Sequence, residues 1–160
     1  MVAMVELFAA MGCPGRFAGG WFAEKEDHLA VPVARYWADR RGNGTPRFER
    51  VAGDVWDLLR NRGAPLARVL REVEPGAMLL IVGGSPCQQL TLAGRHGGRE
   101  GLCGGDSWNF YVFPLVLYAA KRARLDIDVH VTVENAGSMM GKFKRAIAGA
   151  LGIPVQDAHP

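Results

Sequence analysis

Residues 79–91, LLIVGGSPCQQLT, decide how this chain is expected to fold. The apolar, partly β-branched start is typical of a strand buried inside a parallel sheet. The Gly-Gly pair is expected to end the strand, because glycines let the backbone turn sharply and let a ligand approach it. Ser-Pro-Cys then lies at the edge where open α/β sheets bind ligands. Because Pro86 restricts the local backbone, we expect the Cys87 thiol to be held in place, and we interpret it as a nucleophile.

Length and composition favour one cytoplasmic domain covering residues 1–160. Apolar residues make up 49% of the chain, an ordinary value, and no apolar run approaches the ~20 residues that cross a bilayer. The first residues lack a basic region and include Glu6, so no signal peptide and no membrane partner are expected. The net charge of +3 permits a polyanionic partner without requiring one.

Cysteine and histidine spacing argues against several classes of site. The three cysteines, Cys13, Cys87 and Cys103, are far apart and form no Cys-x-x-Cys unit, which argues against a zinc ribbon and against a disulfide framework. The four histidines show no ligand spacing, so no metal site is expected. No Gly-Lys-Ser/Thr follows a predicted strand, which argues against a phosphate-loop NTPase.

Predicted strands alternate with predicted helices along the chain. The strands are expected at residues 2–8, 21–24, 48–51, 77–82 and 127–133, and the helices at 30–37, 56–62, 65–73, 108–124 and 141–151. This alternation predicts the α/β class with a mostly parallel sheet, whose strands end at a common edge. Small or polar residues follow each strand there, namely 8–12, Glu24, Asp54, Cys87 and the pair Glu134 and Asn135.

The glycine-rich, charged segment 93–106 is a long loop directly after the thiol. Such loops inside compact domains are usually functional or disordered, and we interpret this one as a mobile lid with basic side chains. Asp106 or Ser107 is expected to cap the helix that follows. Pro114 indicates that this helix either is kinked or begins at that residue.

Taken together, these motifs closely resemble those of the DNA (cytosine-5) methyltransferase family. Residues 83–88, GGSPCQ, are similar to the catalytic Pro-Cys motif, in the Ser-Pro-Cys form of the de novo branch. Residues 133–135, VEN, resemble the Glu-Asn-Val motif, and residues 53–55, GDV, the Gly-Asp motif. Glu6-Leu7-Phe8 is similar to the start of the cofactor motif Asp-Leu-Phe-x-Gly. Residues 91–94 fit the start of the catalytic loop.

The resemblance covers about residues 1–150 and implies a Rossmann-like methyltransferase fold, truncated after about five strands. It also implies transfer of a methyl group from S-adenosylmethionine to C5 of cytosine in DNA. Cys87 would add to C6 as a thiolate, so that C5 of the resulting enamine attacks the methyl group. Glu134 would hydrogen-bond N3 and the exocyclic amine. Asn135 would hold the loop geometry, and Pro86 would leave its carbonyl free to accept from that amine.

The same resemblance implies binding sites for the cofactor and for DNA. Glu24 or Glu26 would accept from the ribose hydroxyls, Asp54 would bind the adenine amine and Trp108 would lie against the cofactor. The full cofactor set is Phe8, Ala10, Met11, Gly12, Glu24, Asp54, Val55, Gly83 and Trp108. The target base must be flipped out of the duplex, and the loop 92–106 would close over it. Contacts to DNA are expected from Gln88, Thr91, Arg95 and Arg99.

Three departures from the family pattern leave alternatives open. Ala10 stands where the family has glycine, Ala136 replaces the valine of Glu-Asn-Val, and the later arginine motif and target-recognition region do not appear before Pro160. One expectation is the catalytic half of a split enzyme of DNA methylation or restriction–modification. Its second polypeptide would also cover an unpaired edge beside Val131. The alternatives are an inactive methyltransferase-fold protein that binds DNA, cofactor or a partner, and another cysteine-dependent enzyme such as an amidotransferase.

Overall fold

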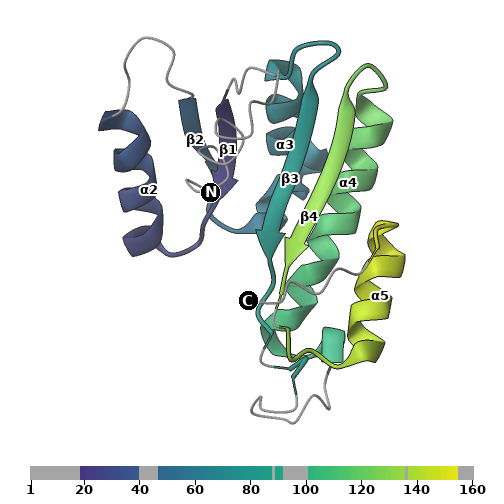
Figure 1. Cartoon of the computed structure of the whole chain (residues 1–160). Helices are drawn as coiled ribbons and strands as arrows, with labels where there is room; N and C mark the ends of the chain where they lie inside the picture. Colours follow the sequence, from purple (N-terminus) through teal and green to yellow (C-terminus); the bar gives the residue numbers. More distant parts are fainter. Residues whose placement is uncertain (1–18, 40–46, 88, 92–100, 136, 155–160) are drawn as a thin grey trace, which may run out of the picture. The chain divides into compact units, whose positions relative to one another are not determined.

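The computed structural model describes residues 19–39, 47–87, 89–91, 101–135 and 137–154 (Figure 1). The chain divides into two compact units, Met1–Asp54 and Val55–Pro160, which are described separately below. The predicted strand 2–8 and the turn after it lie outside the described residues, as do residues 92–100 of the predicted lid. The single domain over residues 1–160 therefore stays a prediction.

The first unit contains a strand–helix–strand arrangement. Its elements are β1 (Gly19–Ala23), α2 (Asp27–Asp39) and β2 (Arg47–Ala52), and the two strands pair in parallel. Phe22 and Phe48 are buried, and the Phe48 ring lies 2.8 Å from where a Cβ on Gly20 would be. The two predicted strands and the helix between them are confirmed, with bounds that differ by a few residues.

The second unit carries a second parallel pair of strands with helices. In chain order, with η denoting a 3₁₀ helix, its elements are η1 (Val55–Leu58), α3 (Arg60–Glu72), β3 (Met78–Gly84), η2 (Gly101–Cys103), η3 (Gly105–Tyr111), α4 (Val112–Ala123), β4 (Asp128–Glu134) and α5 (Gly141–Leu151). The strands β3 and β4 pair without a register shift, from Met78 opposite Asp128 to Gly84 opposite Glu134. The α/β class and the parallel pairing predicted from the sequence are confirmed at this level.

Apolar stripes on α3 and α4 form the core of this unit. The predicted stripe on α3 is buried at Leu66, Val69, Leu70 and Val73. On α4, the residues Val112, Val116, Leu117 and Ala120 are buried, together with the preceding Phe110. Fully burying one side chain of this kind contributes about 1.5–3 kcal/mol, so these two helices supply much of the cohesion around β3 and β4.

Three details of the predicted elements are wrong. The strand predicted to stop at residue 82 includes the Gly-Gly pair and ends at Gly84, because Gly83 and Gly84 still pair with β4. The helix predicted at 56–62 is a short 3₁₀ turn, and Asn61, Arg62 and Gly63 adopt left-handed backbone angles that break any continuous helix. The helix predicted at 108–124 is divided, with α4 beginning only at Val112.

Pro114 lies in the first turn of α4, two residues after its start. The first four N–H groups of a helix have no partner within the helix, so a proline there removes no hydrogen bond. The helix α5 has the predicted bounds and ends at Gly152, whose φ of 65° is the left-handed conformation typical of helix ends. Within the part of the chain that the structure describes, no helix is long and apolar enough to cross a membrane.

Candidate active site

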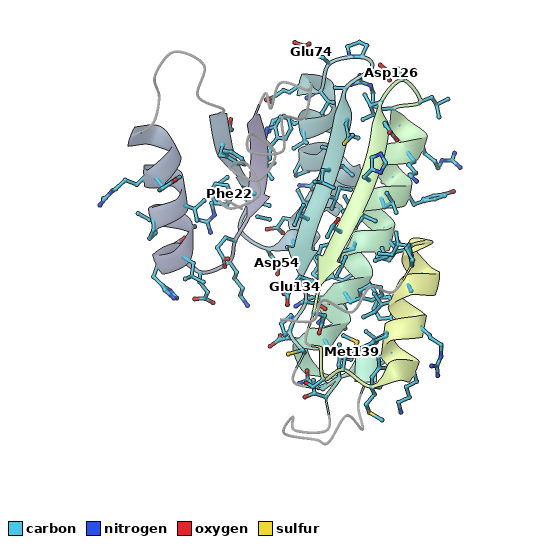
Figure 2. The ribbon with its side chains drawn as sticks, in the orientation of Figure 1. Phe22, Asp54, Glu74, Asp126, Glu134 and Met139 are labelled. Carbon is cyan, nitrogen blue, oxygen red and sulfur yellow. The ribbon has the colours of Figure 1, made fainter. Side chains whose placement is uncertain are left out.

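The parallel register brings the ends of β3 and β4 to one edge, where both predicted motifs begin. Gly84 pairs with Glu134, so the segment with Cys87 and the segment with Asn135 leave the sheet side by side (Figures 1 and 2). The two segments stay together beyond the strands. The Met140 amide donates to the Leu90 carbonyl at 3.1 Å, and residues 91 and 139 form an antiparallel bridge. The structure thus places the segment with Pro86 and Cys87 beside the segment with Glu134 and Asn135.

Glu134 lies directly against Gly84. A Cβ built on Gly84 would be 2.9 Å from the Glu134 carbonyl oxygen and 3.0 Å from its Oε2. A side chain at this position would therefore displace the carboxylate, which explains why the backbone needs glycine here. Cys87 is half-buried and Glu134 is exposed, so neither group is sealed inside the protein.

Asn135 holds the loop that carries Cys87. Its Nδ2 donates to the Ser85 carbonyl at 3.1 Å and lies 3.3 Å from Ser85 Oγ. Ser85 is itself buried, and the Cys87 carbonyl accepts from the Leu90 amide at 2.8 Å. The role predicted for Asn135, holding the loop geometry, has these contacts as its physical basis.

Ser107 holds the same loop from the other side. Its hydroxyl is fully buried, donates to the Pro86 carbonyl at 2.9 Å and lies 2.7 Å from Gln89 Oε1. A hydroxyl has one proton for these two acceptors. Turning the Gln89 amide over makes Gln89 the donor to Ser107 and leaves the serine proton to Pro86. A Cβ on Gly105 would be 2.3 Å from Gln89 Nε2, so the amide occupies space that only glycine leaves open.

These contacts correct two expectations. Neither η3 nor α4 has a side-chain cap, so Ser107 and Asp106 do not cap a helix in the way predicted. The Pro86 carbonyl was expected to be free, but it already accepts from Ser107. A carbonyl oxygen has two lone pairs, so one remains for a second donor.

Trp108 is part of a stacked pair of indoles. Its ring centroid is 4.6 Å from that of Trp56, the rings are 16° from parallel, and Trp108 is 46% exposed. The Trp56 Nε1 donates to Asn109 Oδ1 at 2.7 Å, which fixes the inner ring. Trp56 follows Asp54 and Val55 directly, so this pair joins η3 to the end of the predicted Gly-Asp motif. The sequence analysis missed Trp56, although a tryptophan beside that motif was the available signal.

In the first unit, Glu24 follows the last residue of β1 and is half-buried. Its Oε1 accepts from the Glu26 amide at 3.0 Å, whereas the Glu26 carboxylate is exposed and lies 4.0 Å from His28 Nδ1. Arg50 binds the Glu24 carbonyl and pairs with Asp27 at 2.7 Å, which holds this turn against β2. Of the two predicted ribose ligands, Glu24 therefore has the carboxylate that a backbone hydrogen bond holds in place.

The surroundings of Gly83 and Thr91 do not point to their predicted roles in binding the cofactor and DNA. A Cβ on Gly83 would be 2.7 Å from the Phe113 ring, so this glycine allows α4 to pack closely on β3. Thr91 is only 6% exposed. Its burial does not support the predicted contact with DNA, which stays a prediction. The remaining predicted residues, Phe8, Ala10, Met11, Gly12, Gln88, Arg95 and Arg99, lie outside the described residues.

Comparisons with models of protein families, with curated proteins and with solved structures found no match to this chain. The resemblance to the cytosine-5 methyltransferases therefore depends on its motifs and on the geometry described above. Among the residues with described placement, no group of three or more histidine, cysteine, aspartate or glutamate side chains is arranged to hold a metal ion.

Proposed function

We propose that this protein transfers a methyl group from S-adenosylmethionine to C5 of cytosine in DNA, with Cys87 as the nucleophile. The observation that carries the proposal is the loop 85–87. It leaves β3 beside Glu134, and each of its three carbonyls accepts a hydrogen bond. A loop held at every residue keeps its thiol in one orientation, which is what attack on a positioned ring requires.

In this proposal the Cys87 thiolate forms a bond to C6 of a cytosine that has been flipped out of the duplex. The electron pair of the C5–C6 double bond moves toward C5, which attacks the methyl group and releases S-adenosylhomocysteine. Water then accepts the C5 proton, and the electron pair of the broken C5–H bond re-forms the C5–C6 double bond as the Cys87 thiolate leaves C6. Glu134 binds N3 and the exocyclic amine, and the second lone pair of the Pro86 carbonyl accepts from the same amine.

S-Adenosylmethionine supplies the methyl group in this reaction. In the second unit, the exposed Trp108 ring, backed by Trp56, is the proposed surface against which it would lie. In the first unit, Glu24, whose carboxylate accepts from the Glu26 amide at the end of β1, is the proposed acceptor for its ribose hydroxyls. We propose that the chain has a Rossmann-like, S-adenosylmethionine-dependent methyltransferase fold. DNA and a second polypeptide with the remaining motifs are the proposed partners, in the cytoplasm.

A trapping experiment tests this function. Duplex DNA containing 5-fluorocytosine and S-adenosylmethionine are incubated with the chain, alone and with a candidate companion chain bearing a Gln-Arg-Arg-like motif. Fluorine at C5 blocks the final proton loss, so we expect a covalent protein–DNA adduct, detected by denaturing electrophoresis and mass spectrometry. Cys87→Ser should form none. Cys103→Ser is the matched control, since Cys103 is the other cysteine with a described position, and it should behave like wild type.

The absence of any adduct from the wild-type chain under both conditions would contradict the proposal. If S-adenosylhomocysteine or DNA still binds in that case, the alternative of an inactive methyltransferase-fold binding protein is the better description.

A further inference from the structure

We propose that Ser107 is a positioning residue for Cys87, acting through the carbonyl of Pro86. The inference rests on the proposed function, because it assigns a purpose to the geometry of the thiol. It adds a residue that comes after the predicted lid in the sequence and that belongs to none of the motifs described above.

The backbone of Pro86 controls the direction in which Cys87 leaves the loop. The pyrrolidine ring fixes its φ angle, so its ψ angle is the one soft backbone dihedral left at the residue directly before Cys87. That angle sets the direction of the Pro86 carbonyl, and the planar peptide bond then sets the direction of the Cys87 amide and Cα. A hydrogen bond to the Pro86 carbonyl therefore restrains the dihedral that aims the thiol.

Ser107 is suited to supply this restraint. Its side chain is 0% exposed, so no water competes for the hydroxyl, and the bond to Pro86 joins residues 21 positions apart. Ser107 is in turn held by Gln89, whose amide fills the space left by Gly105. The neighbouring Phe110 is also fully buried, which anchors η3 in the core. The Ser107 hydroxyl therefore has a fixed position, and its hydrogen bond to Pro86 holds the Cys87 loop in place.

The first measurement reads the Pro86 carbonyl directly and needs no substrate. Pro-Cys occurs once in the chain, at residues 86–87, because Cys13 follows Gly12 and Cys103 follows Leu102. Labelling with [1-13C]proline and [15N]cysteine therefore gives a single carbonyl–amide correlation in an HNCO spectrum. Ser107→Ala should move its carbonyl resonance upfield, as loss of a hydrogen bond does, and broaden the peak.

Two further substitutions of Ser107 separate the hydrogen bond from shape. Ser107→Thr retains the hydroxyl and should restore the wild-type carbonyl shift. Ser107→Cys keeps the shape of the side chain but has a weaker hydrogen-bond donor, so its carbonyl shift should lie between those of wild type and Ser107→Ala. If the alanine variant does not fold, the carbonyl shift of Ser107→Cys tests the hydrogen bond in its place. Phe110→Leu is the matched control, because it loosens the same 3₁₀ segment without touching the bond. It should leave the carbonyl shift unchanged.

The second measurement is the rate of adduct formation on 5-fluorocytosine DNA. We expect Ser107→Ala to slow this rate by roughly 10- to 100-fold, the range typical of a small misplacement of a reacting group. Its dissociation constants for DNA and S-adenosylhomocysteine should stay within about 2-fold of wild type, because positioning affects the reacting complex more than binding. Ser107→Thr should recover the rate.

The outcomes separate this inference from the proposed function. An unchanged carbonyl shift in Ser107→Ala, or a changed shift with an unchanged adduct rate, overturns the positioning role. An equal loss of rate in Phe110→Leu overturns it as well, because general loosening would then explain both variants. If the wild-type chain forms no adduct, the proposed function fails and positioning for methyl transfer fails with it, while the carbonyl shift still shows whether Ser107 binds Pro86.

Discussion

At the carboxyl end of the β3–β4 pair, neutral side chains bind the backbone of the Cys87 loop, whereas at the amino end a charged arginine binds backbone carbonyls. There, Arg124 donates to the Leu70 and Val73 carbonyls at the end of α3. It also forms two hydrogen bonds with Asp126, at 2.7 and 2.8 Å. Figure 2 labels Asp126 at this end and Glu134 at the other.

The two ends differ in whether their contacts depend on charge or on the direction of a neutral hydrogen bond. The hydrogen bond between Arg124 and Asp126 lowers the pKa of the Asp126 carboxyl, but both side chains reach water, where such pairs contribute little and can be screened. The bonds from Asn135 and Ser107 are neutral and directional, and they do not titrate. The amino end therefore tolerates substitution, while the geometry of the carboxyl end depends on single atoms.

The largest effect is expected from Gly84→Ala. The new methyl group would meet the Glu134 carbonyl and carboxylate oxygens at 2.9 and 3.0 Å, so the strand end must shift. Overpacking of this kind costs about 1–3 kcal/mol of unfolding free energy, measured by denaturant titration. We expect adduct formation to fall by about 100-fold or more. Gly137→Ala is the matched control, since no atom of the described residues, its two chain neighbours aside, lies within 4 Å of its added Cβ. If Gly84→Ala and Gly137→Ala changed the free energy of unfolding and the adduct rate equally, the β3–β4 carboxyl end would have no special role.

Asn135→Ala should have the next largest effect. It removes the donor to the Ser85 carbonyl, and a hydrogen bond of this type contributes about 0.5–1.5 kcal/mol to stability. The rate of adduct formation should fall by roughly 10-fold, because Ser107 and the Leu90 amide still hold the rest of the loop. This rate is measured by stopping the trapping reaction on 5-fluorocytosine DNA at successive times. A wild-type rate would show that Asn135 is dispensable for the loop.

Arg124→Met should separate the two ends. It removes the donors at the end of α3 and the partner of Asp126, so the melting temperature should fall by a few degrees in a thermal scan. The adduct rate below the melting range should remain that of wild type, since no contact of Arg124 reaches the Cys87 loop. A loss of rate in the folded variant would show that the ends are coupled and would undo the comparison.

The smallest effect is the pH dependence of the amino end. The folded-state pKa of Asp126 is below its ordinary value of 3.8, so its contribution is present above about pH 4 and is lost as the pH falls through the lowered value. Asp126→Asn should therefore reduce the melting temperature near pH 7, and its difference from wild type should shrink as the pH falls below 3.8. A constant difference across this range would contradict the assigned role of the carboxyl group.

Much of the local structure was predictable because it depends on neighbours in the sequence. The buried stripe of α3 at Leu66, Val69 and Leu70 follows from helical spacing, and Gly152 ends α5 through its own backbone freedom. The adjacency of Cys87 and Glu134 followed from two strands of parallel direction. The break between the predicted helices 56–62 and 65–73 was predicted only in part, because the left-handed backbone begins at Asn61, inside the first of them.

By itself, the sequence determined the α/β class, the parallel strands and the pair of motifs that follow β3 and β4, since hydrophobic periodicity and strand direction are local properties. Only the tertiary structure decided that Ser107 binds the Pro86 carbonyl, that Glu134 lies on Gly84 and that Trp56 backs Trp108. These contacts join residues 21 to 52 positions apart, with separations of 107 − 86, 134 − 84 and 108 − 56. Their geometry depends on how buried surfaces fit together, which no short stretch of sequence contains.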